Sequence, residues 1–256
     1  MEHAMIRVEN LCKYFGERTA VDRLTMSIGN ELFVFLGPNG AGKTTSIKMM
    51  TGLLAPHEGT VYLNGVNLQQ APLKAKKLFG LVHEEPVLYE KLTASEFVHF
   101  MARLYNVPKL EAEKRMKQLF EIFEMENRTN DLIEDFSHGM KQKVALTGAL
   151  IHDPQILFLD EPTVGLDPKS ARNMKDLLRG LVEKGHTVFM STHILEVAER
   201  MCDRIGIIHQ GKLIAMGTFE ELSQQAGKSG ATLEDIFLDL TGDTEQAGLE
   251  RFLKEN

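Results

Sequence analysis

Residues 37–45 read Gly37-Pro38-Asn39-Gly40-Ala41-Gly42-Lys43-Thr44-Thr45 and fit the pattern G-x-x-x-x-G-K-[ST]. The run before them, 32–36, is short and apolar like a buried strand, and 46–50 suits the first turns of a helix. In that setting the glycines let the backbone approach a phosphate closely, and successive N–H groups form an anion-binding nest. We therefore predict that residues 37–45 bind nucleotide phosphates, with Lys43 as a fixed cation and the Thr44 hydroxyl on Mg²⁺.

The composition is that of a globular chain of 256 residues, of which 43% are hydrophobic and 25% are charged. A formal net charge of −7 disfavours nucleic-acid binding, which usually needs a basic face. Cys12 and Cys202 stand too far apart for a metal or redox motif, which indicates a reducing compartment. No apolar run approaches the ~18 residues of a membrane span, and residues 1–5 lack the apolar core of a signal peptide. We expect a cytoplasmic protein that is able to dock on a membrane component.

Two adjacent acids, Asp160 and Glu161, follow the apolar run 156–159, which predicts a buried strand. Burying an unpaired carboxylate is costly in free energy, so two acids at one strand end are hard to explain by structure alone and indicate a function. A metal ion and a catalytic water would provide one. Neighbours in a strand point to opposite sides, so we expect Asp160 to face Mg²⁺ while Glu161 faces the attacking water.

Aromatic and histidine side chains near the predicted phosphate loop are further candidates. Tyr14 and Phe15 come just ahead of the strand at 32–36, where an aromatic ring could stack on a purine base. Taken alone, an ordinary half-buried aromatic at a strand end is the favoured explanation. His193 follows a strand predicted at 187–190. A lone histidine is usually structural, but one at a strand end beside a nucleotide site is a better candidate for a γ-phosphate contact.

Two loops supply further polar candidates. Glu84 lies in His83-Glu84-Glu85-Pro86, which leaves a strand predicted at 79–82, and ligands gather at such strand ends in α/β sheets. Ser137 is a natural N-cap for a helix that continues to Ile151, and the dipole of that helix could hold a phosphate. Capping alone would also explain Ser137.

A helical pattern extends over residues 93–126. Thr93-Ala94-Ser95-Glu96 is a capping box, and Pro108 separates two helices. We expect their apolar residues to lie in the core, namely Phe97, Phe100, Met101, Leu104, Met116, Leu119, Phe120 and Phe123. Near the C-terminus we expect a hairpin over 204–215, short helices at 217–225 and 233–240, and a polar, loosely held tail from residue 242.

The motifs follow the order phosphate loop, Ser-His-Gly-Met-Lys, Ile-Leu-Phe-Leu-Asp-Glu, Gly-Leu-Asp-Pro and Ser-Thr-His. This order closely resembles the ABC-type ATPases, over residues 5–220. The resemblance implies an α/β fold, with a P-loop NTPase core, an antiparallel β subdomain and an inserted α-helical subdomain. We expect the ATPase domain at 1–225, its helical subdomain at about 90–152, and a C-terminal helical extension and tail at 226–256.

The resemblance also implies ATP and Mg²⁺ as cofactors and assigns roles to residues. Glu161 would be the catalytic base and His193 the switch histidine. Nucleotide-binding residues would be Phe15 (or its neighbour Tyr14), Gly37, Pro38, Asn39, Gly40, Ala41, Gly42, Lys43, Thr44, Thr45 and Glu84. The signature motif, usually Leu-Ser-Gly-Gly-Gln, would contact ATP of another subunit through Ser137, His138, Gly139 and Met140. Asp167 would belong to the D-loop, and Thr44, Glu84 and Asp160 would be metal ligands.

Two residues depart from the family pattern. His138 replaces the first glycine of the signature, which leaves that backbone less free. Glu84 stands where the family has the glutamine of the Q-loop. A carboxylate is a hard oxygen ligand and can still bind Mg²⁺, although it adds a negative charge. Neither change removes a group that hydrolysis needs.

The family resemblance implies a head-to-tail dimer, homo- or heteromeric, that sandwiches two ATP molecules and drives a separate integral membrane permease. The Ser-His-Gly-Met form, Glu84 and the segment 232–237 are similar to ATPase subunits of bacterial ABC-2-type exporters, which would lie peripherally on the cytoplasmic face of the membrane. The alternative is a soluble ABC ATPase that acts on ribosomes or DNA, but such proteins carry two cassettes or a long coiled-coil insertion. A catalytically inactive cassette is opposed by the intact Lys43, Asp160, Glu161 and His193. The transported substrate would be set by the membrane subunit.

Overall fold

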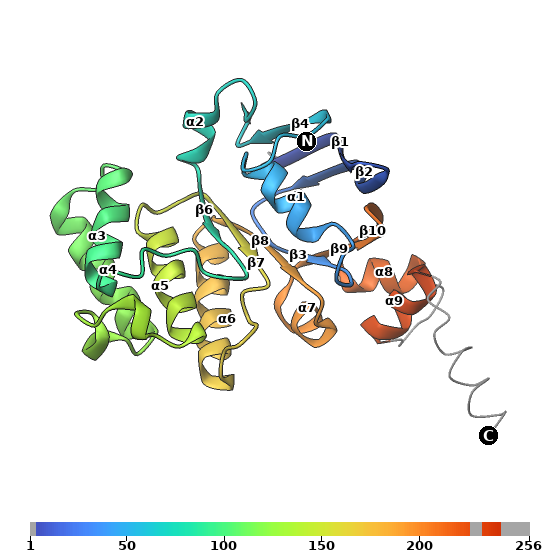
Figure 1. Cartoon of the computed structure of the whole chain (residues 1–256). Coiled ribbons are helices and arrows are strands. Elements are labelled where there is room, and N and C mark those ends of the chain that lie inside the picture. Colours follow the sequence, from blue (N-terminus) through green and yellow to red (C-terminus); the bar gives the residue numbers. More distant parts are fainter. Residues whose placement is uncertain (1–3, 226–231, 242–256) are drawn as a thin grey trace.

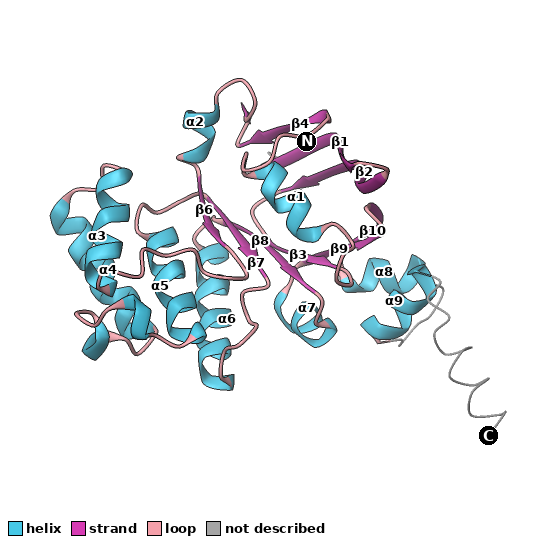
Figure 2. Cartoon of the chain, viewed as in Figure 1, coloured by secondary structure: helices cyan, strands magenta, loops and turns pink. Residues whose placement is uncertain are grey.

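The computed structural model describes residues 4–225 and 232–241, which form two sheets and the helices around them (Figures 1 and 2). The larger sheet has the strand order β10-β9-β3-β8-β7-β6. Its strands are β3 (Leu32–Leu36), β6 (Phe79–Val82), β7 (Ile156–Asp160), β8 (Thr187–Thr192), β9 (Arg204–His209) and β10 (Lys212–Gly217). All neighbouring strands are parallel except β9 and β10, which form the predicted hairpin. The parallel carboxyl ends therefore meet at one edge, where the phosphate loop and the paired acids lie.

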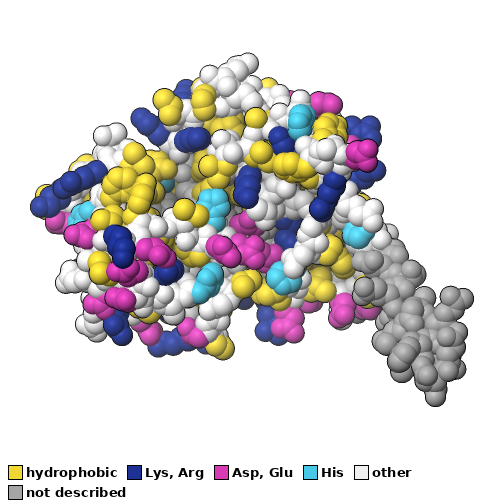
Figure 3. Space-filling view, viewed as in Figure 1, with side chains coloured by type: hydrophobic (Ala, Val, Ile, Leu, Met, Phe, Trp, Pro, Cys, Tyr) yellow, Lys and Arg dark blue, Asp and Glu magenta, His cyan; other side chains and the backbone are white. Residues whose placement is uncertain are grey.

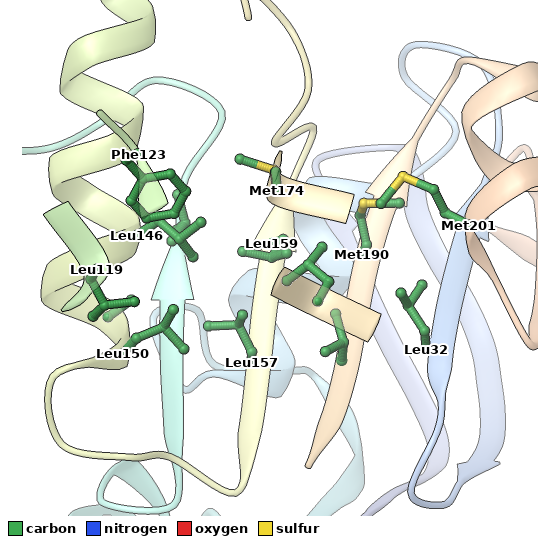
Figure 4. Packing of buried hydrophobic residues seen from close by; sticks show 14 of the residues in the cluster. Leu32, Leu119, Phe123, Leu146, Leu150, Leu157, Leu159, Met174, Met190 and Met201 are labelled. Carbon is green, nitrogen blue, oxygen red and sulfur yellow. The ribbon is translucent and has the colours of Figure 1, made fainter. Parts of the chain in front are cut away.

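Both faces of the large sheet are covered, which explains why its central strands are apolar throughout. Alternation along β3 sends Leu32 and Val34 into one core and Phe33 and Phe35 into the other. The first core packs under the helices that include α5 (His138–Leu150) and α6 (Pro168–Glu183), as Figure 4 shows for part of it. The second packs under α1 (Lys43–Met50) and the smaller sheet.

The smaller sheet is antiparallel, with the order β2-β1-β4-β5. Its strands are β1 (Ile6–Phe15), β2 (Arg18–Ile28), β4 (Glu58–Leu63) and β5 (Val66–Asn67). The first two strands form a long hairpin, which continues to a tight turn at Gly16, whose φ is +58°. Phe15 is thus the last residue of β1 and pairs with Arg18 across the turn. The α/β fold class, with its antiparallel β part and its inserted helices, is confirmed.

The inserted helical region contains α3 (Ala94–Leu104) and α4 (Lys109–Ile122), which lie beside α5 in Figure 1. The capping box is confirmed, because Thr93 Oγ1 accepts from the Glu96 N–H at 3.2 Å and Glu96 Oε2 accepts from the Thr93 N–H at 2.9 Å. The remaining helices are α2 (Pro72–Lys76), α7 (Leu195–Met201), α8 (Phe219–Gln225) and α9 (Leu233–Thr241), with 3-10 turns at Glu126–Arg128 and Ile133–Asp135.

The expectation that every apolar residue of α3 is buried is wrong for two of them. Phe100 is 41% exposed and Leu104 is 63% exposed. The core side of α3 carries Phe97, Val98 and Ala102 instead, so Phe100 and Leu104, one turn apart, form a row beside the buried stripe. The Phe100 ring meets Tyr89 edge to face, with ring centroids 5.3 Å apart.

The helices predicted at 217–225 and 233–240 are confirmed as α8 and α9. The segment 226–231 and the tail predicted from residue 242 lie outside the described residues. Among residues 4–225 and 232–241, every helix is too short or too polar to cross a membrane.

Candidate active site

The loop between β3 and α1 is held in place by the protein's own backbone. A Cβ atom at Gly37 would lie 2.3 Å from the Ile208 carbonyl oxygen, and one at Gly42 would lie 2.5 Å from the Ala20 carbonyl oxygen. Gly42 also has a φ of +109° where it begins α1. These two glycines are therefore required by contacts with both sheets, a reason separate from the approach of a phosphate.

Lys43 begins α1 and is buried at the base of this loop. Its ammonium donates to the carbonyl oxygens of Gly37 at 2.7 Å and Pro38 at 3.2 Å. The same Nζ atom lies 3.2 Å from Glu161 Oε1. The predicted cation and the predicted base are thus an ion pair within one site.

Asp160 and Glu161 are both buried at the carboxyl end of β7, as predicted. Asp160 ends the strand and accepts a 2.5 Å hydrogen bond from the Ser191 hydroxyl. The expected strand alternation between the two acids is wrong, because Glu161 has left the strand and has a φ of +48°. A non-glycine residue there is strained by about 1–3 kcal/mol, and such strain is concentrated at functional sites. Hydrogen bonds from Glu161 N to the Ser191 carbonyl and hydroxyl hold this turn.

The turn at Glu161 aims its carboxylate at two neighbours. Oε1 lies 3.0 Å from His193 Nδ1 as well as 3.2 Å from Lys43 Nζ, and Oε2 accepts from the His193 N–H at 3.3 Å. His193 follows β8, and its side chain is 42% exposed. The two residues predicted to be catalytic are therefore brought into direct contact, while the proposed γ-phosphate contact of His193 stays a prediction.

A pocket of about 470 Å³ opens over these groups. Its lining consists of Phe15, Arg18, Ala20, Asn39, Gly40, Gly42, Lys43, Thr44, Thr45, Glu84 and Glu161. The structure thus joins the predicted aromatic residue, the phosphate loop, Glu84 and Glu161 in one cavity. Phe15, and not Tyr14, lines it. Arg18 and Ala20 were missed from sequence, although the close spacing of Phe15 and Arg18 around Gly16 is the signal that a hairpin would pair them.

The charges of the pocket lining are mixed, because it contains Arg18 and Lys43 as well as Glu84 and Glu161. On the face drawn in Figure 3, acidic and histidine side chains gather near the middle, and basic side chains lie around them on several sides. His83, which precedes Glu84, has its pKa lowered by burial; the Asp160 carboxylate raises it in part, and the Lys48 ammonium lowers it further. The neutral form of His83 is therefore favoured, although the Asp160 carboxylate is near.

The predicted signature and the predicted D-loop contact each other, and none of their residues lines the pocket of this chain. Ser137 caps α5 by accepting from the Met140 N–H at 3.4 Å. The His138 ring lies so close to Gly165 that a Cβ atom there would be 2.7 Å from His138 Cδ2. A Cβ atom at Gly139 would be 3.3 Å from the Gly165 carbonyl oxygen.

Asp167 begins α6 as its N-cap, accepting from Ser170 N at 2.9 Å and from the Ser170 hydroxyl at 2.5 Å. These hydrogen bonds hold the pKa of Asp167 below its usual range. Within the described part of the chain, no group of three or more His, Cys, Asp or Glu side chains forms a metal cluster of its own. The oxygen ligands at hand fit Mg²⁺ bound together with phosphates, because Asp160 is a buried carboxylate and Thr44 and Glu84 line the pocket.

Comparison with known proteins identifies the class to which this fold and site belong. Residues 21–164, more than half of the chain, match the family model described as "ABC transporter". The chain therefore belongs to the ABC transporter family, as one of its ATP-binding subunits, and it is an ATPase. A linearmycin resistance ATP-binding protein, LnrL of Bacillus subtilis (strain 168), is 40% identical over 224 residues, which are 87% of this chain and 72% of that protein.

Two further proteins extend the comparison. The Nod factor export ATP-binding protein I of Ralstonia nicotianae is 36% identical over 219 residues, which are 85% of this chain and 68% of that protein. Among solved structures, the dimeric ATP-binding cassette MJ0796, in a post-hydrolysis state bound to ADP and Pi, aligns with a TM-score of 0.76 and 28% identity. That alignment covers 84% of this chain and 98% of the cassette.

Proposed function

We propose that this chain is the ATP-hydrolysing subunit of an exporter, coupling the closure of an ATPase dimer to a separate membrane permease. The observation that carries the proposal is the contact of Glu161 with both Lys43 and His193 at the base of the phosphate loop. Export is supported by similarity to a resistance protein and to a Nod factor export protein.

In this proposal Glu161 acts as the general base that orients the attacking water, and His193 holds the Glu161 carboxylate from its other side. Lys43 contacts the β- and γ-phosphates, and Phe15 stacks on the base. Thr44, Asp160 and Glu84 hold Mg²⁺, which neutralises phosphate charge when it is bound. Burial lowers the pKa of His83, which favours its neutral form, so His83 adds no cation near Asp160.

The active dimer is proposed to be head to tail, with the signature of one chain completing the pocket of the other. Support comes from the exposure of Ser137 and His138, neither of which is among the residues that line the pocket of their own chain. The exposed N-terminus of α5 suits a phosphate of a second chain. The related cassette MJ0796 is dimeric.

The permease is proposed to contact an outer apolar patch formed by Val87, Tyr89, Phe100 and Leu104. Val87 is 80% exposed and Tyr89 is 61% exposed, and the ring of Tyr89 packs against that of Phe100. Such a patch is typical of a protein interface. It begins three residues after Glu84 in the same loop, so a permease bound there is linked to the pocket. The chain would then be peripheral on the cytoplasmic face of the membrane.

Membrane co-purification tests this proposal. We expect the full chain to pellet with membranes and to carry one integral membrane protein through detergent purification. Phe100→Glu should abolish that capture while ATP turnover of the purified chain stays within about twofold, because Phe100 is outside the pocket. Lys114→Glu, on the solvent side of α4, is the matched control. Recovery of both variants with ribosomes or DNA, and not with membranes, would support the soluble alternative and reject the transport role.

A further inference from the structure

Arg18 is a second cation in the nucleotide pocket, and neither the motifs nor the proposed reaction uses it. It begins β2 and pairs in register with Phe15, the last residue of β1. Side chains directly opposite each other in an antiparallel pair point to the same face. Both side chains line the pocket beside Gly40 and Lys43. The hairpin therefore presents an aromatic ring and a guanidinium to one cavity.

The guanidinium of Arg18 already touches the phosphate loop. Its Nη2 donates to the Gly40 carbonyl oxygen at 3.3 Å, and it lies 3.4 Å from where a Cβ atom of Gly40 would stand. Arginine carries five N–H donors in a planar fork that matches phosphate oxygens. One bond to Gly40 leaves donors for a ligand at the same place.

The charges of the other residues that line the pocket indicate a role for Arg18. Lys43 is ion-paired with Glu161, and Glu84 adds a second carboxylate to the lining. Throughout the described ranges, 4–225 and 232–241, Arg18 forms no ion pair with a carboxylate. A triphosphate brings several negative charges into a pocket whose own charges cancel. Arg18 is the cation available to offset the charge that Glu84 introduces.

We propose that Arg18 is a nucleotide-binding residue. Its guanidinium contacts the polyphosphate of a nucleotide whose base stacks on Phe15. This rests on nucleotide binding at the pocket, as described above. The contact is electrostatic and independent of the base, so it contributes equally to ATP and GTP. Arg18 is not assigned to the chemical step, because it contacts Gly40 of the phosphate loop, whereas the proposed base Glu161 contacts Lys43 and His193.

The competing explanation is that Arg18 only braces the phosphate loop through Gly40. Arg18→Gln separates the two, because glutamine keeps an N–H donor for the Gly40 carbonyl but has no charge. Arg18→Lys keeps the charge and loses the fork. Arg23→Ala is the matched control, since Arg23 lies on the same strand, is exposed, pairs with Asp22 and does not line the pocket.

The experiment measures the Kd of MgATP and MgGTP by calorimetry at several salt concentrations for the full chain. We expect Arg18→Ala and Arg18→Gln to weaken both nucleotides about tenfold and to flatten the salt dependence, because a charged hydrogen bond is lost. Arg18→Lys should retain most of the affinity, and Arg23→Ala should bind like the wild type. Melting curves establish that each variant is folded.

Wild-type affinity in Arg18→Gln would assign Arg18 to bracing the loop and overturn the proposal, as would wild-type affinity in Arg18→Ala. A loss for ATP alone would mean base recognition and would also overturn it. Lys43→Ala, measured in parallel, distinguishes a failure of the proposal for Arg18 from a failure of nucleotide binding at this pocket. If Lys43→Ala bound nucleotide with wild-type affinity, nucleotide binding at this pocket would be rejected. If Lys43→Ala lost affinity while Arg18→Ala kept it, only the role of Arg18 would be rejected.

Discussion

Glu161 Oε1 lies 3.2 Å from Lys43 Nζ, and both side chains are buried. The carboxylate proposed to activate water and the ammonium proposed to hold phosphate thus neutralise each other across the pocket. His193 Nδ1 contacts the same oxygen at 3.0 Å. Any nucleotide phosphate that engages Lys43 must therefore compete with Glu161 for the ammonium, and a substitution at one residue alters the electrostatics of the other.

Glu161→Gln should reduce ATP hydrolysis on the order of 10²–10⁴-fold, because glutamine keeps the shape of the side chain and cannot act as a base. ATP binding should persist and become tighter, because the phosphate no longer competes with an anionic side chain for the Lys43 ammonium. The variant should also trap an ATP-bound dimer, seen as a doubling of mass in size-exclusion chromatography with light scattering. Glu183→Gln, an exposed acid at the end of α6, is the control. Turnover near that of the wild type would remove Glu161 from the role of base.

Lys43→Ala should weaken ATP by about 10–100-fold, because a charged donor to phosphate is lost. The chain should still fold, but at reduced stability, since Glu161 then keeps a buried negative charge without its ammonium partner. Adding Glu161→Gln to Lys43→Ala should restore part of the melting temperature, which a double-mutant cycle by calorimetry would measure. Unchanged ATP affinity in Lys43→Ala would mean that the loop does not bind nucleotide. If the changes in melting temperature of the two single variants added up to that of the double variant, the ion pair would contribute nothing to stability.

Glu84→Gln should raise the Mg²⁺ concentration needed for half-maximal ATPase activity. A carboxylate carries a negative charge and therefore attracts the ion more strongly than a neutral amide at contact distance. The maximal rate should stay within roughly tenfold, because Glu161 and His193 remain. Glu85→Gln, the neighbour that does not line the pocket, should titrate like the wild type. Superimposable Mg²⁺ titrations for Glu84→Gln and the wild type would reject the metal-ligand role.

His152 should make folding stability depend on pH. Burial lowers the pKa of His152 from 6.5 to about 4, while Nε2 is bound to the Phe79 carbonyl oxygen and the ring stacks on Tyr105. Between these pKa values the unfolded chain binds the proton more readily, so stability falls as pH drops from 6.5 toward 4 and is complete above 6.5. We expect the loss to be about 1–2 kcal/mol after discounting for partial exposure.

His152→Phe keeps the stacking on Tyr105 and removes the titration, so its stability should vary less with pH over that window. Urea unfolding of both proteins at pH 4.5, 5.5 and 7.5 measures the difference. His99→Phe, at a histidine in α3 of the same helical region, controls for general acid effects. Parallel pH profiles for His152→Phe and the wild type would contradict the assignment of this dependence to His152.

Much of this fold was readable from local signals. Apolar runs located the central strands, Ser137 and Thr93 located helix starts, and the order of motifs located the nucleotide site. These signals depend on neighbours within a few residues, which is why they survive in sequence. The exposure of Phe100 and Leu104 was not readable, because helical periodicity alone does not say how wide a stripe the neighbouring helix covers.

The conformation of Glu161 was also beyond sequence reasoning. Its φ of +48° is imposed by Ser191, which lies on another strand, so strand alternation extrapolated from 156–160 failed at the next residue. Arg18 was missed for a related reason. Its place in the pocket depends on the register of the β1–β2 hairpin, which has several irregularities that alternation does not reveal.

The close contacts of Gly37 with the Ile208 carbonyl and of Gly42 with the Ala20 carbonyl have a thermodynamic consequence. They pin both ends of the phosphate loop to strands of two different sheets, so the loop is ordered before any ligand arrives. Fixing a flexible backbone costs roughly 1–2 kcal/mol per residue, and a preformed loop avoids that cost on association. Ordering this segment should therefore add only a small entropic cost to nucleotide binding. That cost is instead included in the free energy of folding of the domain.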